Sequence, residues 1–154
     1  NYFMKRVIQI ILLIFSIFIF VVIIKYNFFT DNESKFYKNG WDSYENNQYD
    51  LTLFYLNRVD KNKYPDVVAP IGFSYMEKKD YNNAISNLTV AYNKGIGKKE
   101  GYFNKITNSL GICYMQMGNL TKSKYFLLEA EKQGNPNSKR NLQILDSLEN
   151  TSNK

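Results

Sequence analysis

Histidine is absent from the 154-residue sequence, and cysteine occurs once, as Cys113. Without histidine the chain has no Ser-His or Cys-His catalytic pair and no histidine metal ligand. A single cysteine excludes an intramolecular disulfide, and a lone cysteine in a helical stretch is typically a small buried apolar residue. We therefore expect no catalytic site, no cofactor and no metal site, and predict that the protein is not an enzyme.

Glycine and proline are also scarce, with eight and three residues. The closest pair of glycines, Gly95 and Gly97, follows a predicted helix instead of a strand. It also lacks the flanking residues of a phosphate-binding loop. Nucleotide binding through such a loop is therefore not expected.

Basic residues are only slightly in excess once the N-terminal region is set aside, although the whole chain has a net charge of +6. Residues 1–25 contain Lys5, Arg6 and Lys25 and no acidic residue, which leaves 17 of the 20 basic residues against all 14 acidic ones. Such a mixed surface argues against a nucleic acid partner. Frequent Asn, Lys, Tyr, Phe and Ile, with few Arg, are typical of an AT-rich genome and favour a bacterial source.

A long uncharged run stands near the N-terminus, from Val7 to Ile24, with Gln9 and Ser16 as its only polar residues. As a helix it would be roughly 27 Å long, close to the ~30 Å hydrocarbon core of a bilayer. A buried core helix of this length normally has a polar face, and this run has none. Residues 7–24 are therefore predicted to cross a membrane, within an N-terminal anchor that covers residues 1–25.

The main alternative is a cleaved signal peptide, whose apolar region runs roughly 7–15 residues and ends at small residues. The run here is longer, and Lys25 and Tyr26 follow it in place of small residues. Lysine and tyrosine are residue types that lie at the membrane interface. An uncleaved anchor, followed by a juxtamembrane linker at residues 26–35, is better supported.

Basic residues flank the run on both sides, so the preference of Lys and Arg for the cytoplasmic side barely decides its orientation. A short basic N-terminal tail usually stays in the cytoplasm, and a domain after it is translocated largely regardless of charge. We expect a single-pass protein of the bacterial cytoplasmic membrane, with its C-terminal domain on the extracytoplasmic side. The alternative is a domain that faces the cytosol.

The rest of the sequence repeats itself around Pro70–Ala91, which contains two apolar stripes separated by a polar break. Offsets of 32 residues toward the N-terminus and 39 toward the C-terminus align this stretch with two further copies. Small residues let two helices approach closely, so we expect three helical hairpins with leucines in their seams. The equivalent positions are Gly40, Gly72 and Gly111; Thr52, Ala84 and Ser123; and Leu56, Leu88 and Leu127.

Breaker residues stand where the hairpins should turn or end. Polar breakers mark the three turns, at residues 46–47, 78–80 and 118–119. Pro65 and Pro136 stand at repeat ends, where one helix must stop and the next begins. Pro70 lies inside the first helix of the second copy, which predicts that this helix begins late.

The central copy resembles the tetratricopeptide repeat, a helix–turn–helix unit of about 34 residues. The residues that carry the resemblance are Gly72, Tyr75, Tyr81, Ala84, Leu88 and Ala91. The first copy departs from the pattern, with Ser43 at the place of Tyr75. The third copy, with its longer connection around Gly95–Gly101 and its Glu129–Asn135 run, is similar to the longer Sel-like repeats.

The resemblance implies an all-α fold over residues 36–150. We expect a short α-solenoid of about three hairpins, closed by a capping helix over residues 136–150 and followed by a frayed tail at residues 151–154. Four apolar residues of the capping helix are expected to cover the last hairpin: Leu142, Ile144, Leu145 and Leu148.

In the tetratricopeptide family, the first helix of each pair lines a concave face that binds extended ligands. Transferred position by position, this implies a partner-binding strip made of Tyr37, Trp41, Tyr44, Phe73, Met76, Glu77, Asn108, Ile112, Met115 and Gln116. Aromatic residues and Met are favoured at recognition surfaces, although packing between repeats accounts equally well for any one aromatic residue. The basic run Lys94, Lys98, Lys99 and Lys105 is interpreted as a solvated loop and not as an anion site.

We therefore expect a non-catalytic scaffold that is anchored in a membrane and binds a protein or peptide partner in the concave face. The alternative is a small structural or accessory envelope protein that associates with itself through its anchor or through the end of the solenoid.

Overall fold

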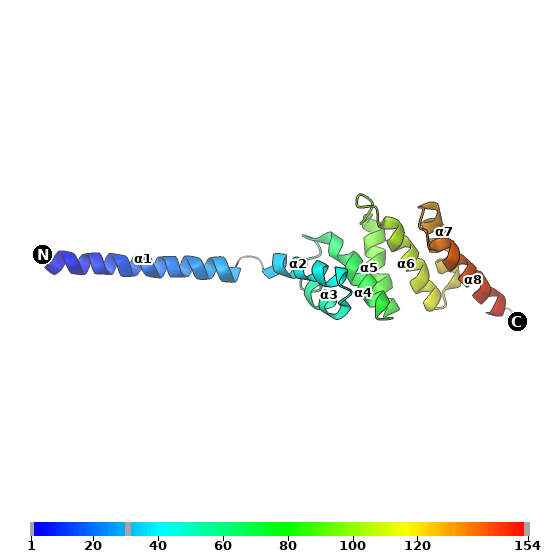
Figure 1. Cartoon of the computed structure of the whole chain (residues 1–154), viewed down its shortest axis with the longest axis horizontal. Coiled ribbons are helices and arrows are strands. Elements are labelled where there is room, and N and C mark those ends of the chain that lie inside the picture. Colours follow the sequence, from blue (N-terminus) through cyan, green and yellow to red (C-terminus); the bar gives the residue numbers. More distant parts are fainter. Residues whose placement is uncertain (1, 30–31, 153–154) are drawn as a thin grey trace. The chain divides into compact units, whose positions relative to one another are not determined.

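The computed structural model describes residues 2–29 and 32–152, with side chains described for residues 4–22 and 32–151, and these residues are all-helical (Figure 1). The chain divides into two compact units, one reaching Lys35 and the other beginning at Phe36. Helix α1, Tyr2–Phe29, makes up most of the first unit. The second unit contains a short 3-10 helix and seven α-helices, the first of which begins just before Phe36.

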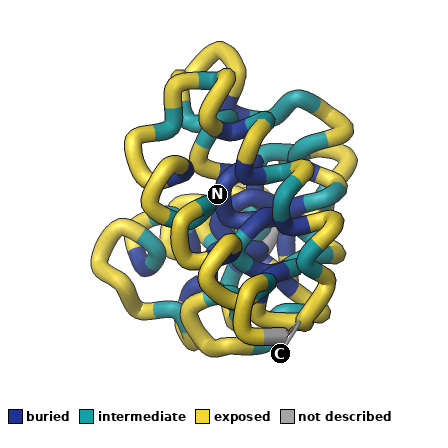
Figure 2. The backbone as a smooth tube through the Cα atoms, turned by 90° about the vertical axis from the view of Figure 1, so that its right-hand side faces the viewer, coloured by how far each residue is buried: buried dark blue, intermediate teal, exposed yellow. Residues whose placement is uncertain are grey.

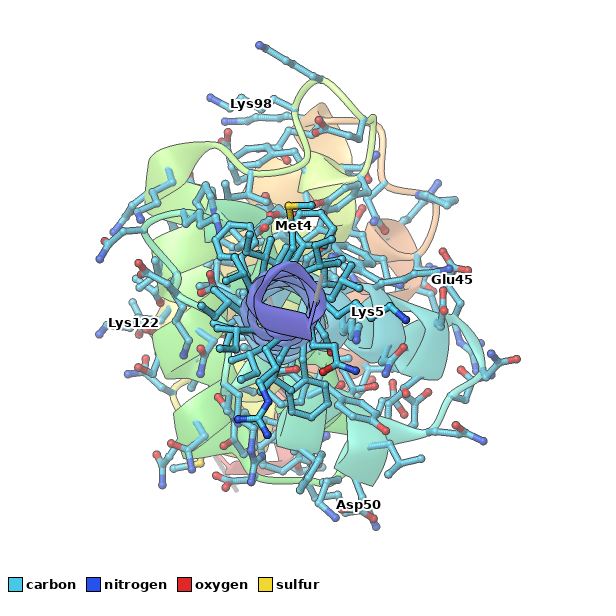
Figure 3. The ribbon with its side chains drawn as sticks, turned by 90° about the vertical axis from the view of Figure 1, so that its left-hand side faces the viewer. Met4, Lys5, Glu45, Asp50, Lys98 and Lys122 are labelled. Atoms are coloured by element: carbon cyan, nitrogen blue, oxygen red, sulfur yellow. The ribbon has the colours of Figure 1, made fainter. Side chains whose placement is uncertain are left out.

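Helix α1 is apolar on all sides. Its 19-residue window Met4–Val22 has a mean hydropathy of 2.4, and no part of it is buried. Viewed along its axis, the side chains spread in every direction (Figure 3). An exposed helix of this length and composition is consistent with a membrane anchor or a signal sequence.

The predicted interfacial residues Lys25 and Tyr26 have side chains outside the described residues. The predicted linker at residues 26–35 is largely helical, because α1 reaches Phe29 and the next helix begins at Asn32. Its residues 30 and 31 lie outside the described residues.

The second unit consists of helices packed sequentially in pairs, followed by one last helix. The first helices of the pairs are α2 (Asn32–Glu45), α4 (Val68–Glu77) and α6 (Phe103–Gln116). Their partners are α3 (Tyr49–Leu56), α5 (Tyr81–Lys94) and α7 (Leu120–Lys132), and α8 (Ser138–Ser152) comes last. Figure 2 shows the buried segments in the interior of this unit, with exposed turns around them.

Each pair is closed by contact between a glycine of its first helix and a leucine of its second helix. In the third pair, a Cβ atom on Gly111 would lie 2.6 Å from Leu127 Cγ, closer than real Cβ contacts. The same closeness recurs in the other two pairs, where a Cβ atom on Gly40 would overlap Leu56 Cδ2 and one on Gly72 would lie 2.7 Å from Leu88 Cγ. The three leucines are fully buried, as are the small residues Thr52, Ala84 and Ser123. The seams predicted from the aligned positions are confirmed.

The turns within the pairs share one backbone geometry. Each has a residue in the left-handed region, Asn47 (φ 57°), Lys79 (φ 62°) or Gly118 (φ 73°). The next residue donates its backbone N–H to the carbonyl five positions earlier, at 2.8–2.9 Å, which satisfies a free carbonyl at the helix end. In the second and third pairs the side chain of that next residue, Asp80 or Asn119, caps the following helix.

Pro65 and Pro70 have the effects on helix ends that the sequence predicts. Pro65 opens the 3-10 helix η1 (Pro65–Val67), and α4 begins only at Val68, so it has 10 residues where α2 and α6 have 14. Pro70 is the third residue of α4 and is buried. At this position its missing N–H is tolerated, because the first N–H groups of a helix have no partner within that helix.

Helix α8 covers the last pair with only part of its apolar surface. Leu145 is fully buried against Leu127 and Met115, and Leu142 packs beside it. Ile144 and Leu148, which were also expected to cover the hairpin, are 42 % and 41 % exposed. That expectation is wrong for these two residues, because both are rotated by about 60–100° from Leu145 toward the flank of the helix opposite Leu142.

Replacing Gly111 by Ala is expected to lower the free energy of unfolding by about 1–3 kcal/mol, because the added methyl group displaces Leu127. In an unstrained helix the same change would raise it by roughly 0.5–1 kcal/mol, so the sign alone tests the contact. Urea unfolding of the full chain in maltoside micelles, followed by Trp41 fluorescence, measures the difference. Ser86→Ala at an exposed position of α5 is the control and should cause no loss. A stabilised Gly111→Ala variant would contradict the close approach of α6 and α7.

Candidate interaction site

A row of aromatic side chains crosses from α2 to the second pair. Tyr37, Trp41 and Tyr44 lie on one face of α2 because they are spaced by four and three residues. Their ring centroids are 6.4 and 6.1 Å apart, and Phe73 of α4 stacks on Tyr44 at 6.0 Å. Tyr64, just before η1, stacks on Tyr37 at 4.7 Å. We call these five residues the aromatic row.

The Tyr37 hydroxyl ties α2 to η1 by donating a hydrogen bond of 2.6 Å to Asp66 Oδ2. Burial and this bond to a carboxylate raise the pKa of Tyr37 from 10.0 to about 12, because both disfavour the phenolate. The indole N–H of Trp41 lies near the same hydroxyl and lowers that pKa slightly. The indole nitrogen is shielded from solvent, and among the described residues it has no hydrogen-bond partner of good geometry.

A small cavity of about 210 Å³ lies where α2, α4 and the start of α6 meet. Its walls are aromatic and aliphatic, with one charged side chain, and consist of Trp41, Tyr44, Ala69, Pro70, Phe73, Tyr102 and Lys105. The volume is below the ~300–1,000 Å³ of small-molecule sites and suits a single side chain.

A larger cavity of about 830 Å³ adjoins the small one and shares Trp41 and Tyr102 with it. Its other walls are Tyr37 of α2, residues 65–66, the end of α5 and the connection 95–100 between α5 and α6. That connection folds back on itself, because the N–H groups of Tyr102 and Phe103 both bond to the Gly97 carbonyl, at 2.9 and 3.1 Å. Gly97 has a φ of 82° and lies so close to the Tyr102 ring that a Cβ atom would be 2.6 Å from it.

Carboxylates dominate the charge around the Tyr102 hydroxyl. Burial, then Glu100 and Asp66, raise the pKa of Tyr102 to about 12. Lys94, Lys98 and Lys99 also line the larger cavity, but none of them contributes to that shift. The ammonium of Lys98 lies over the Phe103 ring, 4.8 Å from its centroid, and Figure 3 shows Lys98 at the outer edge of its unit.

The structure gathers some of the predicted strip and separates the rest. Tyr37, Trp41, Tyr44 and Phe73 form most of the aromatic row. Met76 and Ile112 are half-buried, and Glu77 and Gln116 are exposed at the ends of α4 and α6. Asn108 and Met115 are buried against α8, where Asn108 Oδ1 accepts a bond of 2.9 Å from Asn141 and Met115 packs with Leu145. These two residues therefore do not line an open surface.

Three residues of the site were missed by the sequence analysis: Asp66, Tyr102 and Lys105. Lys105 was grouped with the basic loop, but its ammonium lies over two rings of the aromatic row. The 39-residue offset that aligns Gly72 with Gly111 also aligns Asp66 with Lys105, but the two residues make different contacts, so the repeat register did not indicate either of them. The sequence did not indicate Tyr102 either, because the position of its side chain depends on how the preceding loop closes.

Cys113 is fully buried in the core, as predicted. Burial raises the pKa of its thiol to about 12, so the reactive thiolate is not formed near neutral pH. It acts as a small apolar residue of α6.

Replacing Tyr37 by Phe is expected to reduce stability by about 1 kcal/mol or more near neutral pH, because the bond to Asp66 is lost. The raised pKa of Tyr37 stabilises the folded chain below pH 10, and this contribution disappears as the pH rises toward about 12. The variant should therefore lose less stability than the wild type over that window. Urea unfolding at about pH 8 and about pH 11 measures both effects.

Tyr81→Phe in α5 is the matched control, because the Tyr81 hydroxyl has no hydrogen bond to any described residue. It should unfold like the wild type at both values of pH. An identical alkaline loss in Tyr37→Phe and in the wild type would contradict the role given to the Asp66 contact.

Comparison with known proteins finds no match: no protein-family model, no curated protein and no solved structure is similar to this chain. The function assigned to the site therefore depends on the geometry of its own residues.

Proposed function

We propose that the protein is a non-catalytic scaffold that is anchored in a membrane and binds a protein or peptide partner at the aromatic row. In this proposal the three helix pairs are tetratricopeptide-like repeats of a short solenoid, and α8 is its cap. The shared glycine–leucine contact and the shared turn geometry of the pairs support this interpretation.

The observation that carries the proposal is the pair of adjoining cavities beside the aromatic row. The cavities measure about 210 and 830 Å³, and Trp41 and Tyr102 line both of them. Tryptophan and tyrosine are enriched at interfaces because they bury large apolar area and lose little conformational entropy. A peptide that crosses both cavities would cover the half-buried faces of Trp41 and Tyr44.

The apolar helix α1 supports the membrane part of the proposal. Its uncharged run from Val7 and the exposed surface of its Met4–Val22 window are the properties of an anchor. We place the helix pairs on the extracytoplasmic side of a bacterial cytoplasmic membrane, because Lys5 and Arg6 precede the uncharged run and basic residues favour the cytoplasmic side. The alternative places them in the cytosol.

Self-association through the end of the solenoid is a second candidate function, and the exposure of Ile144 and Leu148 on α8 favours it. These two residues are four apart and so lie on one side of the helix. A second copy that packs there would bury both.

Photocrosslinking tests the two functions against each other. Benzoyl-phenylalanine in place of Glu100 lies at the larger cavity and is expected to capture a partner. The same residue in place of Tyr125, which is 59 % exposed on α7, is the control and should capture little. In place of Ile144 it tests self-association, which would give a covalent dimer of the chain. The scaffold proposal fails if Glu100 and Tyr125 give equal labelling.

A further variant tests whether the captured protein binds at the aromatic row. Trp41→Leu removes the ring that both cavities share, so capture from position 100 should fall severalfold. Circular dichroism of the purified variant shows whether the helices are retained. Unchanged capture in a helical Trp41→Leu chain would contradict a role for the aromatic row.

Cysteine labelling tests the orientation. Cys113 is the only cysteine of the chain and is fully buried, so a membrane-impermeant maleimide should barely react with the wild type. Lys99→Cys places a thiol at an exposed position of the loop. It should be labelled in intact cells, as strongly as after lysis, if the helix pairs are extracytoplasmic. Labelling only after lysis would place them in the cytosol.

A further inference from the structure

The small cavity has the construction of an aromatic cage. Four aromatic side chains surround it, Trp41 and Tyr44 from α2, Phe73 from α4 and Tyr102 from the loop before α6. Tyr44 and Phe73 are stacked with 20° between their planes, and Trp41 stands edge-on to Tyr44 at 86°. Ring faces carry partial negative charge and attract cations. We call Trp41, Tyr44, Phe73 and Tyr102 the aromatic cage.

The chain already places a cation of its own against this cage. Lys105 Nζ lies 4.6 Å from the Phe73 centroid and 5.6 Å from the Tyr44 centroid, and it donates a hydrogen bond of 3.0 Å to the Tyr44 hydroxyl. No carboxylate pairs with Lys105 among the described residues. The Lys105 side chain is exposed, so two partly solvated cation–π contacts and one hydrogen bond to a hydroxyl hold the ammonium there.

The groups around the cage favour a cation over an anion. Glu100 and Asp66 are the charged groups that act on Tyr102, and both act as negative charges. The Trp41 indole N–H, the cage's one aromatic N–H donor, is shielded from solvent and cannot reach an anion. Among the residues that line the small cavity, only Lys105 carries a charge that would attract a negative group.

We propose that the aromatic cage binds a cationic side chain of the partner, a lysine or an arginine, and that Lys105 is an internal occupant which this side chain displaces. The proposal rests on the proposed function, because it names the chemistry that the scaffold recognises at its aromatic row. Lys105 then acts as a built-in competitor whose ammonium lies against the Tyr44 and Phe73 rings when no partner is bound. A partner cation that is less hydrated than an ammonium, such as a guanidinium, competes best.

The test measures binding to the full chain in maltoside micelles, which contain no choline head group. The cationic probe is N-acetyl-trimethyl-lysine methylamide. The matched neutral probe carries a tert-butyl group in place of the trimethylammonium, and phenylacetate is the anionic probe. Trp41 is the only tryptophan of the chain and part of the cage, so its fluorescence reports occupancy directly.

Lys105→Met is the decisive variant, because the two kinds of ligand predict opposite changes. A cationic ligand should bind about two- to fivefold more tightly to Lys105→Met, because it no longer has to displace a partly exposed ammonium from the Tyr44 and Phe73 rings. Lys122→Met is the matched control, since Lys122 Nζ lies 5.1 Å from the Tyr114 centroid and is at the edge of the unit in Figure 3. Its affinity should equal that of the wild type. Tyr44→Leu, which removes a cage wall, should bind the cation more weakly than the wild type.

Three results would overturn the proposal. The first is equal binding of the cationic and neutral probes. The second is phenylacetate binding to the wild type that weakens in Lys105→Met, which would identify an anion site. The third is no response of Trp41 to any probe.

The proposal of a partner-binding scaffold and the proposal of a cation-binding cage can be refuted separately. A partner captured at position 100 that trimethyl-lysine does not displace would refute the cage and leave the scaffold. Trimethyl-lysine binding without any captured partner would refute the scaffold and leave the cage.

Discussion

The helical unit depends on a glycine that lies against a leucine in each helix pair. At Gly40, Gly72 and Gly111 there is no room for a Cβ atom, and the facing leucine is fully buried. A close approach of this kind fixes both the separation of two helices and their rotation about their own axes, because only one residue of the turn is small enough to lie at the contact. A helix that rotated by one position would bring a full side chain into the seam.

The close contact between glycine and leucine also determines the direction of the side chains next to each glycine. Successive residues of a helix are rotated by about 100°, so the residue after the glycine points to the side of the seam and not into it. Trp41 follows Gly40 and Phe73 follows Gly72, and both line the small cavity. Ile112 follows Gly111 at the equivalent position of α6 and is half-buried. The aromatic row therefore takes its direction from the same contacts that close the helix pairs.

The part of the fold that repeats could be predicted, because its contacts are local in sequence. The 32- and 39-residue offsets identified the seams and the turns, and Pro70 indicated the late start of α4. The cavities could not be predicted in this way. Tyr102 reaches its place through a loop that turns at Gly97, and Asn108 and Met115 lose their open surface to α8, a contact between helices that the repeat register does not contain. The prediction of which α8 residues pack inward was also only half right, because Ile144 and Leu148 are exposed.

The contacts between cations and aromatic rings are another feature that the sequence alone did not predict. The chain combines an excess of lysine with 13 Tyr and 11 Phe, and it places several cations on ring faces. Arg58 over Phe54, Lys98 over Phe103 and Lys122 over Tyr114 each pair one cation with one ring. Lys105 differs because it contacts rings from two helices, α2 and α4, at a cavity that both helices line. A cation over a single ring covers one ring face, whereas Lys105 contacts two rings at the edge of a cavity, which is the arrangement that the proposed displacement requires.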